Sequence, residues 1–307
     1  MIVLQAGTES YVIGISTALL AALLFAITNI IYKRFDREIS IFEIVATRMW
    51  IGFPLALLLI LPPFNPDGVR VTFDGILILT FSMATGALLG DGCYFASQSM
   101  IGVSKAYPIV MSYPLGVYAL AAIYLSEPVI VSRLLGAVLI IVGITLIAQD
   151  PQEKGTNEEE ESNPRILLIG LVFASLTILF WALSDFSLQV GLIDVDPLDA
   201  NFVRFALGSL LLLPVAPFSR TRNGRLADPK FLTLILLTGI VGFGVPILLM
   251  TYSVSYIGAT VMSIIMAASP LFGTPLSILY LKEKVTRLIG LGTIIIFIGI
   301  ILVIVAI

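Results

Sequence analysis

The sequence predicts an all-α polytopic membrane protein with ten transmembrane helices arranged as two inverted five-helix repeats. Three observations support this prediction: an apolar composition, apolar runs long enough to cross a membrane, and a repeat between the two halves of the chain. Hydrophobic residues make up 58% of the 307 residues and charged residues only 12%, whereas soluble domains carry about 25% charged residues. The mean hydropathy of +1.06 is far too high for a surface in contact with water.

The composition also excludes several classes of protein. A net charge of −3 provides no basic surface for nucleic acid, so we expect no nucleic-acid partner. The chain has no histidine and one cysteine, Cys93, which rules out a Ser-His-Asp triad, an intrachain disulfide and the usual His/Cys zinc site. We expect Cys93 to be a small packing residue, and we expect no enzyme activity, no metal and no cofactor.

Ten apolar runs are each long enough for a helix across a hydrocarbon core of about 30 Å. None shows the alternation of polar and apolar residues that marks the strands of an outer-membrane barrel. No basic residue precedes the first run, so we interpret it as a membrane span and not as a cleavable signal. The predicted spans are 11–32, 41–61, 74–97, 103–125, 133–149, 166–189, 198–218, 230–252, 257–281 and 287–306.

A hydrophilic segment at 150–165 divides the ten spans into two groups of five. It contains six acids and two bases together with proline and glycine, a composition typical of a flexible linker. The predicted organisation is a first five-helix repeat at 1–149, an acidic linker at 150–165 and a second repeat at 166–307.

A shift of 156 residues aligns the first half with the second, without a gap, from about residue 14 to residue 127. Apolar matches are common in such a composition, so the matched glycine, proline, arginine and glutamate residues carry the argument for an internal duplication. Since each half has an odd number of spans, the second half must enter the membrane from the opposite side, which gives an inverted repeat. The matched pairs include Gly14/Gly170, Arg48/Arg204, Gly86/Gly242, Pro114/Pro270 and Glu127/Glu283.

The distribution of positive charge predicts which side of the membrane faces the cytoplasm. Of the 17 Lys and Arg residues, 13 lie in the connections that follow odd-numbered spans, and only Arg70 and Arg133 lie in the opposite connections. We therefore expect the linker 150–165 in the cytoplasm and both termini outside. The predicted location is the cell (inner, or cytoplasmic) membrane.

Three segments resemble a known family: ITNI in the first span, YPLGVYALAAIYLSE in the fourth and SPLFGTPLSILYLKE in the ninth. Together with the two five-helix repeats they resemble the EamA-type members of the drug/metabolite transporter (DMT) superfamily, over nearly the whole chain. The resemblance implies a central cavity and movement of small metabolites, often outward, although members carry amino acids, sugars, nucleotide sugars and drugs. We expect a secondary transporter that works by alternating access, with a small-molecule substrate and the lipid bilayer as partners.

Other classes of protein stay open as alternatives. A channel or facilitator, or a non-transporting membrane receptor, would fit the same spans. A membrane enzyme would need clustered histidines, acids or metal ligands, and the acids here are scattered. No P-loop of the form G-x-x-x-x-G-K-[ST] occurs, so energy for transport must come from a gradient. One chain supplies both halves and could work as a monomer, while a homodimer is left open.

Polar groups inside predicted spans are candidates for function, because their burial in lipid is energetically costly unless they are paired or hydrated. Asn29 and Asp185 occupy equivalent positions late in the first helix of each half, and Asn29 matches an asparagine common in the family that the chain resembles. We predict that both residues bind substrate and that Asp185 is a proton-coupling candidate. The alternative is a polar cap near the membrane interface.

Asp91 lies in a glycine-rich segment, GALLGDGCYFASQSM. The i, i+3, i+7 spacing places Asp91, Tyr94 and Gln98 on one helical face, so a carboxylate, a phenol and an amide share one stripe. We predict that these three residues bind substrate and that Asp91 is a second proton-coupling candidate. The alternative is a structural ion pair between Asp91 and Lys105.

Pro114 and Pro270 lie in the middle of the fourth and ninth spans. Proline frees a backbone carbonyl in a helix, and broken helices form midplane sites in many transporters. We predict that the prolines are structural and that polar residues beside them line the substrate site; the alternative is a kink that only shapes packing. The predicted lining residues are Tyr107, Ser112, Tyr113, Ser263, Met266 and Ser269.

Four charged residues are predicted to be structural. Arg48 and Arg204 each follow an acid by five residues. A pattern kept in both halves suits the structural frame more than a ligand site; the alternative is an anion clamp, since arginine binds carboxylate or phosphate with two parallel bonds. Glu127 and Glu283 close the fourth and ninth spans, and we expect each to pair with a basic residue that opens the next span. The expected partners are Arg133 and Arg287.

Overall fold

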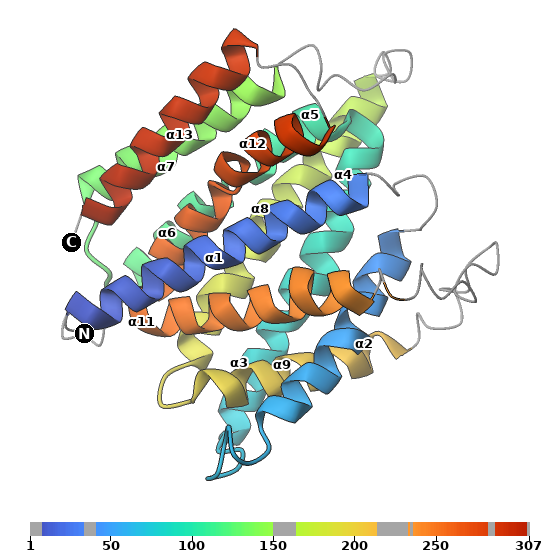
Figure 1. Ribbon diagram of the computed structural model, residues 1–307, viewed down its shortest axis with the longest axis vertical. Coiled ribbons are helices and arrows are strands. Elements are labelled where there is room, and N and C mark those ends of the chain that lie inside the picture. Colours follow the sequence, from blue (N-terminus) through green and yellow to red (C-terminus); the bar gives the residue numbers. More distant parts are fainter. Residues whose placement is uncertain are drawn as a thin grey trace.

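The computed structural model describes residues 8–33, 41–149, 164–213, 233, 236–281 and 286–305. Within these residues every regular element is a helix, which confirms the predicted all-α fold (Figure 1). The elements are α1 (Thr8–Lys33), α2 (Ile41–Leu59), α3 (Phe73–Met83), η2 (Ala84–Gly90), α4 (Asp91–Ile101), α5 (Val103–Val110), α6 (Tyr113–Tyr124), α7 (Val131–Ala148), α8 (Pro164–Gly191), α9 (Pro197–Leu211), η6 (Ile240–Gly244), α11 (Val245–Ala267), α12 (Pro270–Leu281) and α13 (Arg287–Val305).

Seven helical segments in the described residues are long and apolar enough to cross a membrane, which confirms a multi-pass membrane protein. One of them, Leu236–Leu276, has 41 residues, about twice the ~20 residues needed for one crossing, and covers parts of two predicted spans. The number of ten spans stays a prediction. The seven segments are Glu9–Thr28, Phe73–Ile101, Lys105–Tyr124, Val131–Ala148, Pro164–Gly191, Leu236–Leu276 and Arg287–Val305.

Two segments depart from α-helical geometry at equivalent positions. The π-helical turns η2 and η6 begin at Ala84 and Ile240, which are 156 residues apart. Gly102 and Gly258, separated by the same 156 residues, have φ angles of 77° and 78°. Glycine adopts such angles without the strain that a side chain would cause. At Gly102 the helix α4 turns directly into α5, and at Gly258 the helix α11 is kinked within its length.

The last helices of the two halves, α7 and α13, lie side by side along one edge of the molecule (Figure 1). Glycines bring their backbones into contact. A Cβ atom at Gly143 would lie 2.6 Å from the carbonyl oxygen of Gly292, and a Cβ atom at Gly292 would lie 2.6 Å from the carbonyl oxygen of Gly143. Gly136 and Gly299 have the same reciprocal relation. Small residues at such crossings are typical of helices that pack in lipid.

Contacts elsewhere between the two halves are reciprocal as well. Gly14 packs against Ile257, and its equivalent Gly170 packs against Ile101, the equivalent of Ile257. The contacts therefore repeat when the chain is shifted by 156 residues. The same relation links the contact Gly86–Ser184 with the contact Gly242–Thr28.

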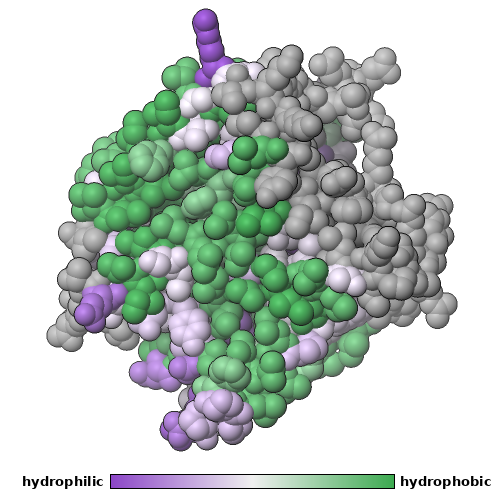
Figure 2. All heavy atoms as spheres, in the orientation of Figure 1, coloured by the Kyte–Doolittle hydropathy of each residue, from purple (hydrophilic) through white to green (hydrophobic). Residues whose placement is uncertain are grey.

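Apolar side chains cover most of the described surface in Figure 2, while hydrophilic side chains gather near the top and bottom of the view. Large residues such as Leu58, Ile294 and Phe297 are 57%, 58% and 53% exposed. A surface of this kind would be an aggregation hazard in water, whereas lipid tails solvate it.

Candidate functional site

Asp91 is the first residue of α4 and follows directly on the π-helical turn η2. Its Oδ1 atom accepts a hydrogen bond of 3.0 Å from Nε1 of Trp181 in α8. This bond joins helices from the two halves of the sequence. π-helical turns are frequent at functional sites. A Cβ atom at the neighbouring Gly92 would meet no atom within 4 Å, so there is open space next to Asp91.

Aromatic rings from three helices surround this hydrogen bond. The Trp181 ring centroid lies 5.2 Å from that of Tyr94 in α4 and 5.4 Å from that of Tyr113 in α6, which meets it edge-on. Both separations fall in the favourable range for aromatic pairs. Gln98, one turn after Tyr94, is close enough to hydrogen-bond with the Tyr94 hydroxyl.

The two prolines that we predicted to be structural both lie in the first turn of a helix. Pro114 is the second residue of α6 and Pro270 is the first residue of α12, positions where the missing N–H needs no helical partner. Polar groups meet next to these breaks, where the Tyr107 hydroxyl lies 3.2 Å from Oγ of Ser269. The Tyr107 side chain also lies near that of Tyr94, so the breaks adjoin the aromatic rings.

Asp185 lies one turn after Trp181 on α8 and is 7% exposed. Tyr113 and Arg204 are both close enough to interact with its charge. Arg204, which is 5% exposed, donates from Nη1 to the Thr251 hydroxyl at 3.4 Å. The Asp185 and Arg204 side chains, both in the described part of the chain, make no direct ion pair with each other.

Arg48 occupies the position equivalent to Arg204 and lies near the half-buried carboxylate of Asp91. Its charge acts on Asp91, and its guanidinium carbon is 5.7 Å from the centroid of the Phe243 ring, within the range of a cation–π interaction. Each of the two carboxylates therefore has one of the two equivalent arginines within electrostatic range.

The structure brings six of the eight predicted substrate-binding residues into one connected set, which we call the central group. Asp91 bonds to Trp181 and not to Lys105, the alternative partner. Met266 belongs to the apolar core, and the side chain of Asn29 lies outside the described residues. No cluster of three or more metal-ligating residues occurs among the described residues. The central group comprises Asp91, Tyr94, Gln98, Tyr107, Tyr113, Trp181, Asp185 and Ser269.

Sequence reasoning missed Trp181, the residue that bonds to Asp91 and lies one helical turn before Asp185. The sequence did contain one sign that Trp181 belongs to the site. Trp181 precedes Asp185 by four residues, so the two side chains share one helical face. Its contact with Asp91 spans 90 positions of sequence, and helical periodicity gives no information about such a distant pair.

A second charged cluster lies in the connection between α6 and α7. Glu127 Oε1 forms an ion pair of 3.3 Å with Nη1 of Arg133, and Glu127 Oε2 accepts a hydrogen bond of 2.9 Å from the Thr260 hydroxyl in α11. Burial raises the pKa of Glu127 above its usual value, although the Thr260 hydroxyl and Arg133 both act to lower it. The carboxylate thus ties this connection to α11 in the other half. Its equivalent, Glu283, lies outside the described residues.

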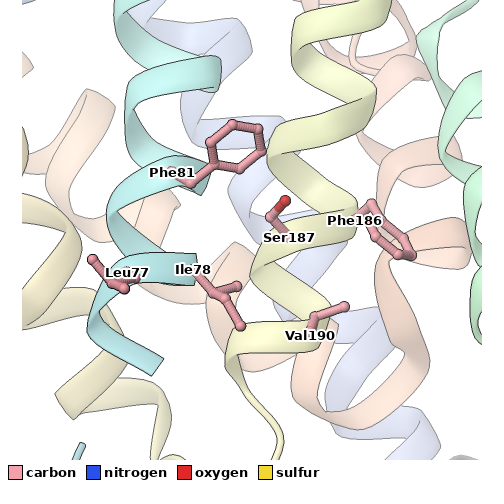
Figure 3. Close-up of a pocket in the computed structure, with 6 residues that line it drawn as sticks. All are labelled: Leu77, Ile78, Phe81, Phe186, Ser187 and Val190. Carbon is pink, nitrogen blue, oxygen red and sulfur yellow. The ribbon is translucent and has the colours of Figure 1, made fainter. Parts of the chain in front are cut away.

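A separate cavity of about 370 Å³ lies between α3 and α8 (Figure 3). Leu77 on its rim is 53% exposed, so the cavity opens to the outer surface. Its α8 residues Phe186 and Val190 lie on a different i, i+4 row from Trp181 and Asp185, so the cavity is not part of the central group. The lining residues are Leu77, Ile78, Phe81, Phe186, Ser187 and Val190.

Comparison with known proteins identifies the family of the chain. The EamA-like transporter family matches residues 12–149 and again residues 168–305. The chain belongs to the EamA-like transporter family. Because 168 − 12 = 156, the two matches have the same offset as the glycine kinks and the reciprocal contacts. Family membership makes this EamA-like protein a membrane transporter by class, with a small-molecule substrate.

Two proteins with sequences similar to this chain are named as transport proteins. An uncharacterized transporter of Archaeoglobus fulgidus is 26% identical over 287 residues, which cover 93% of this chain and 95% of the relative. The glucose uptake protein GlcU of Staphylococcus xylosus is 31% identical over 150 residues, which cover 46% of this chain and 50% of that protein.

A solved structure, described only as the crystal structure of a protein, matches the fold with a TM-score of 0.73. It is 14% identical and the match covers 96% of both chains. At this identity the likeness shows a shared fold alone.

Proposed function

We propose that this EamA-like protein is a secondary transporter that moves a small metabolite or drug across the membrane by alternating access. The observation that carries the proposal is the hydrogen bond between Asp91 and Trp181, which joins α4 of the first half to α8 of the second. Asp185, a buried carboxylate, lies one turn away. A polar contact between two halves inside the membrane is where a substrate site is expected in transporters.

The proposed architecture is ten spans in two inverted five-helix repeats, 1–149 and 166–307, joined by a cytoplasmic linker at 150–165. The reciprocal contacts support it, because surfaces that exchange equivalent contacts are related by a twofold axis. An odd number of spans in each half places that axis in the membrane plane. The distribution of Lys and Arg supports a location of both termini outside the cell membrane.

Glucose is the first solute to test, because one relative is named as a glucose uptake protein. We would measure counterflow of labelled glucose in proteoliposomes, followed by amino acids, nucleotide sugars, polyamines and cationic drugs. A carrier should give saturable counterflow with at least one solute. Flux that does not saturate would favour a channel, and binding without any flux would favour a receptor.

Replacing Trp181 with phenylalanine keeps an aromatic ring but removes the N–H that bonds to Asp91. Hydrogen bonds to charged groups contribute about 1.5–3 kcal/mol, so we expect the KM of the transported solute to rise by about tenfold or more. Trp50→Phe is the matched control, because Trp50 bonds to the Ser209 carbonyl outside the central group, at 3.3 Å. Equal KM values for the two variants would contradict a role for Trp181.

We propose Asp91 and Asp185 as the proton-coupling residues. Asp91→Asn and Asp185→Asn keep the shape of the side chain but remove its exchangeable charge, so transport by these variants should no longer respond to a pH gradient. Asp74→Asn is the control, since Asp74 is an exposed acid in the first turn of α3. Proton dependence that persists in both test variants would exclude coupling through these carboxylates.

A further inference from the structure

Two buried charged atoms beside the aromatic rings have no hydrogen-bond partner among the described residues: Oδ2 of Asp185 and Nε of Arg204. The residues are 7% and 5% exposed, so bulk water does not reach them freely. Buried polar atoms nearly always have a partner, and a buried charge that lacks one is costly. A solute that donates to Asp185 and accepts from Arg204 would satisfy both atoms.

The charges of Asp185 and Arg204 balance when the Asp185 carboxyl is ionised. Arg204 and Asp185 act on each other electrostatically, and the equivalent Arg48 acts on Asp91 in the same way. A ligand with a net charge would leave one unit of charge uncompensated in a low-dielectric interior, which is strongly unfavourable. The aromatic rings alone would also suit a cation, but the balanced pair opposes one.

Resting on the transporter function proposed above, we infer that the solute held here carries no net charge and offers a hydrogen-bond donor to Asp185 and an acceptor to Arg204. Hydroxyl groups provide both functions, and a zwitterion provides them as an ammonium and a carboxylate. Tyr113 and Trp181 supply an aromatic surface for the apolar part of such a solute.

Variants that unbalance the pair test this inference. Thermal shifts of purified protein would be measured with glucose, alanine, tetraethylammonium and lactate, which represent an uncharged, a zwitterionic, a cationic and an anionic solute. Wild type should bind neither charged probe. At a pH at which the Asp185 carboxyl is ionised, Arg204→Gln leaves a negative charge in excess and should bind tetraethylammonium at least about tenfold more tightly than any residual binding by wild type. Asp185→Asn leaves a positive charge in excess and should do the same for lactate.

The double variant Asp185→Asn/Arg204→Gln restores the balance and should again respond to neither charged probe, which controls for a general loosening of the site. Arg204→Gln could fail to fold, in which case Asp185→Asn and the double variant still test the inference. Stabilisation of wild type by tetraethylammonium or lactate as strong as that of the variants would overturn it, as would charge preferences that do not change. Saturable counterflow of a cation would overturn this inference alone, whereas no counterflow of any solute would contradict the transporter function.

Discussion

Arg133→Met should lower the free energy of unfolding by about 3 kcal/mol at neutral pH, because removal of one partner of a buried ion pair costs about 3–5 kcal/mol. The Arg133 and Glu127 side chains are only 10% and 17% exposed, so water compensates poorly for the lost partner. We expect the lower end of the range because the Thr260 hydroxyl still bonds to Glu127. Denaturant unfolding in detergent at pH 7 would measure the loss.

At acid pH, Arg133→Met should lower the free energy of unfolding by less than it does at pH 7. Burial already raises the pKa of Glu127, and Arg133 is one of the groups that lower it, so the variant should have a still higher pKa at Glu127 in the folded state. Between the usual value of 4.5 and that raised value, the folded state holds a proton that the unfolded state has released. Stability of the variant therefore falls as pH rises through this window, and is recovered below it.

The double variant Glu127→Gln/Arg133→Met is the control for this prediction. It removes both charges, and replacement of a whole buried pair is often nearly neutral. We expect it to recover most of the lost stability and to lose the dependence on pH. If Arg133→Met is as stable as wild type at pH 7, or equally unstable at pH 4 and pH 7, the ion pair does not hold the α6–α7 connection as we infer.

Gly292→Ala should destabilise the protein by about 1–3 kcal/mol, the usual range for an overpacked contact. The added Cβ atom would lie 2.6 Å from the carbonyl oxygen of Gly143 and 2.7 Å from Cγ1 of Ile147. The carbonyl is a backbone atom, so the clash is relieved only if α7 and α13 move apart. The midpoint of thermal unfolding in detergent would report the change.

Gly290→Ala is the matched control in the same helix. A Cβ atom there would meet no atom within 4 Å, and alanine favours a helix over glycine by about 1 kcal/mol. This variant should therefore be as stable as wild type or more stable. Equal destabilisation by Gly290→Ala and Gly292→Ala would show that the α7–α13 contact is not the cause.

Local features of the fold were predictable from the sequence, because lipid requires each spanning segment to satisfy its own backbone hydrogen bonds. A long apolar run in such a solvent becomes a helix whatever its neighbours are. Helical spacing placed Asp91, Tyr94 and Gln98 together for the same reason, since all three lie on one element. The repeat at an offset of 156 residues located Gly102 and Gly258 as a pair, although their role as turning points came from the structure.

Contacts between distant helices were not predictable in this way. Lys105 is 14 positions from Asp91 and was a reasonable partner by proximity, but the carboxylate bonds to Trp181. Thr260 reaches Glu127 across 133 positions, and the sequence suggested only Arg133. The π-helical turns η2 and η6 also have no sequence signal that we recognise.

The sequence by itself was enough to predict a helical membrane protein and to find the 156-residue repeat. It also located the polar residues inside predicted spans, where they are costly unless they are paired or hydrated. The tertiary structure decided the partners of the polar residues: Asp91 bonds to Trp181, Glu127 bonds to Thr260, and Asp185 lies within electrostatic range of Arg204. The difference has a physical cause. Helix formation in lipid depends on interactions a few residues apart, whereas side-chain pairing depends on how close glycines let the helices approach and how each helix is rotated about its axis.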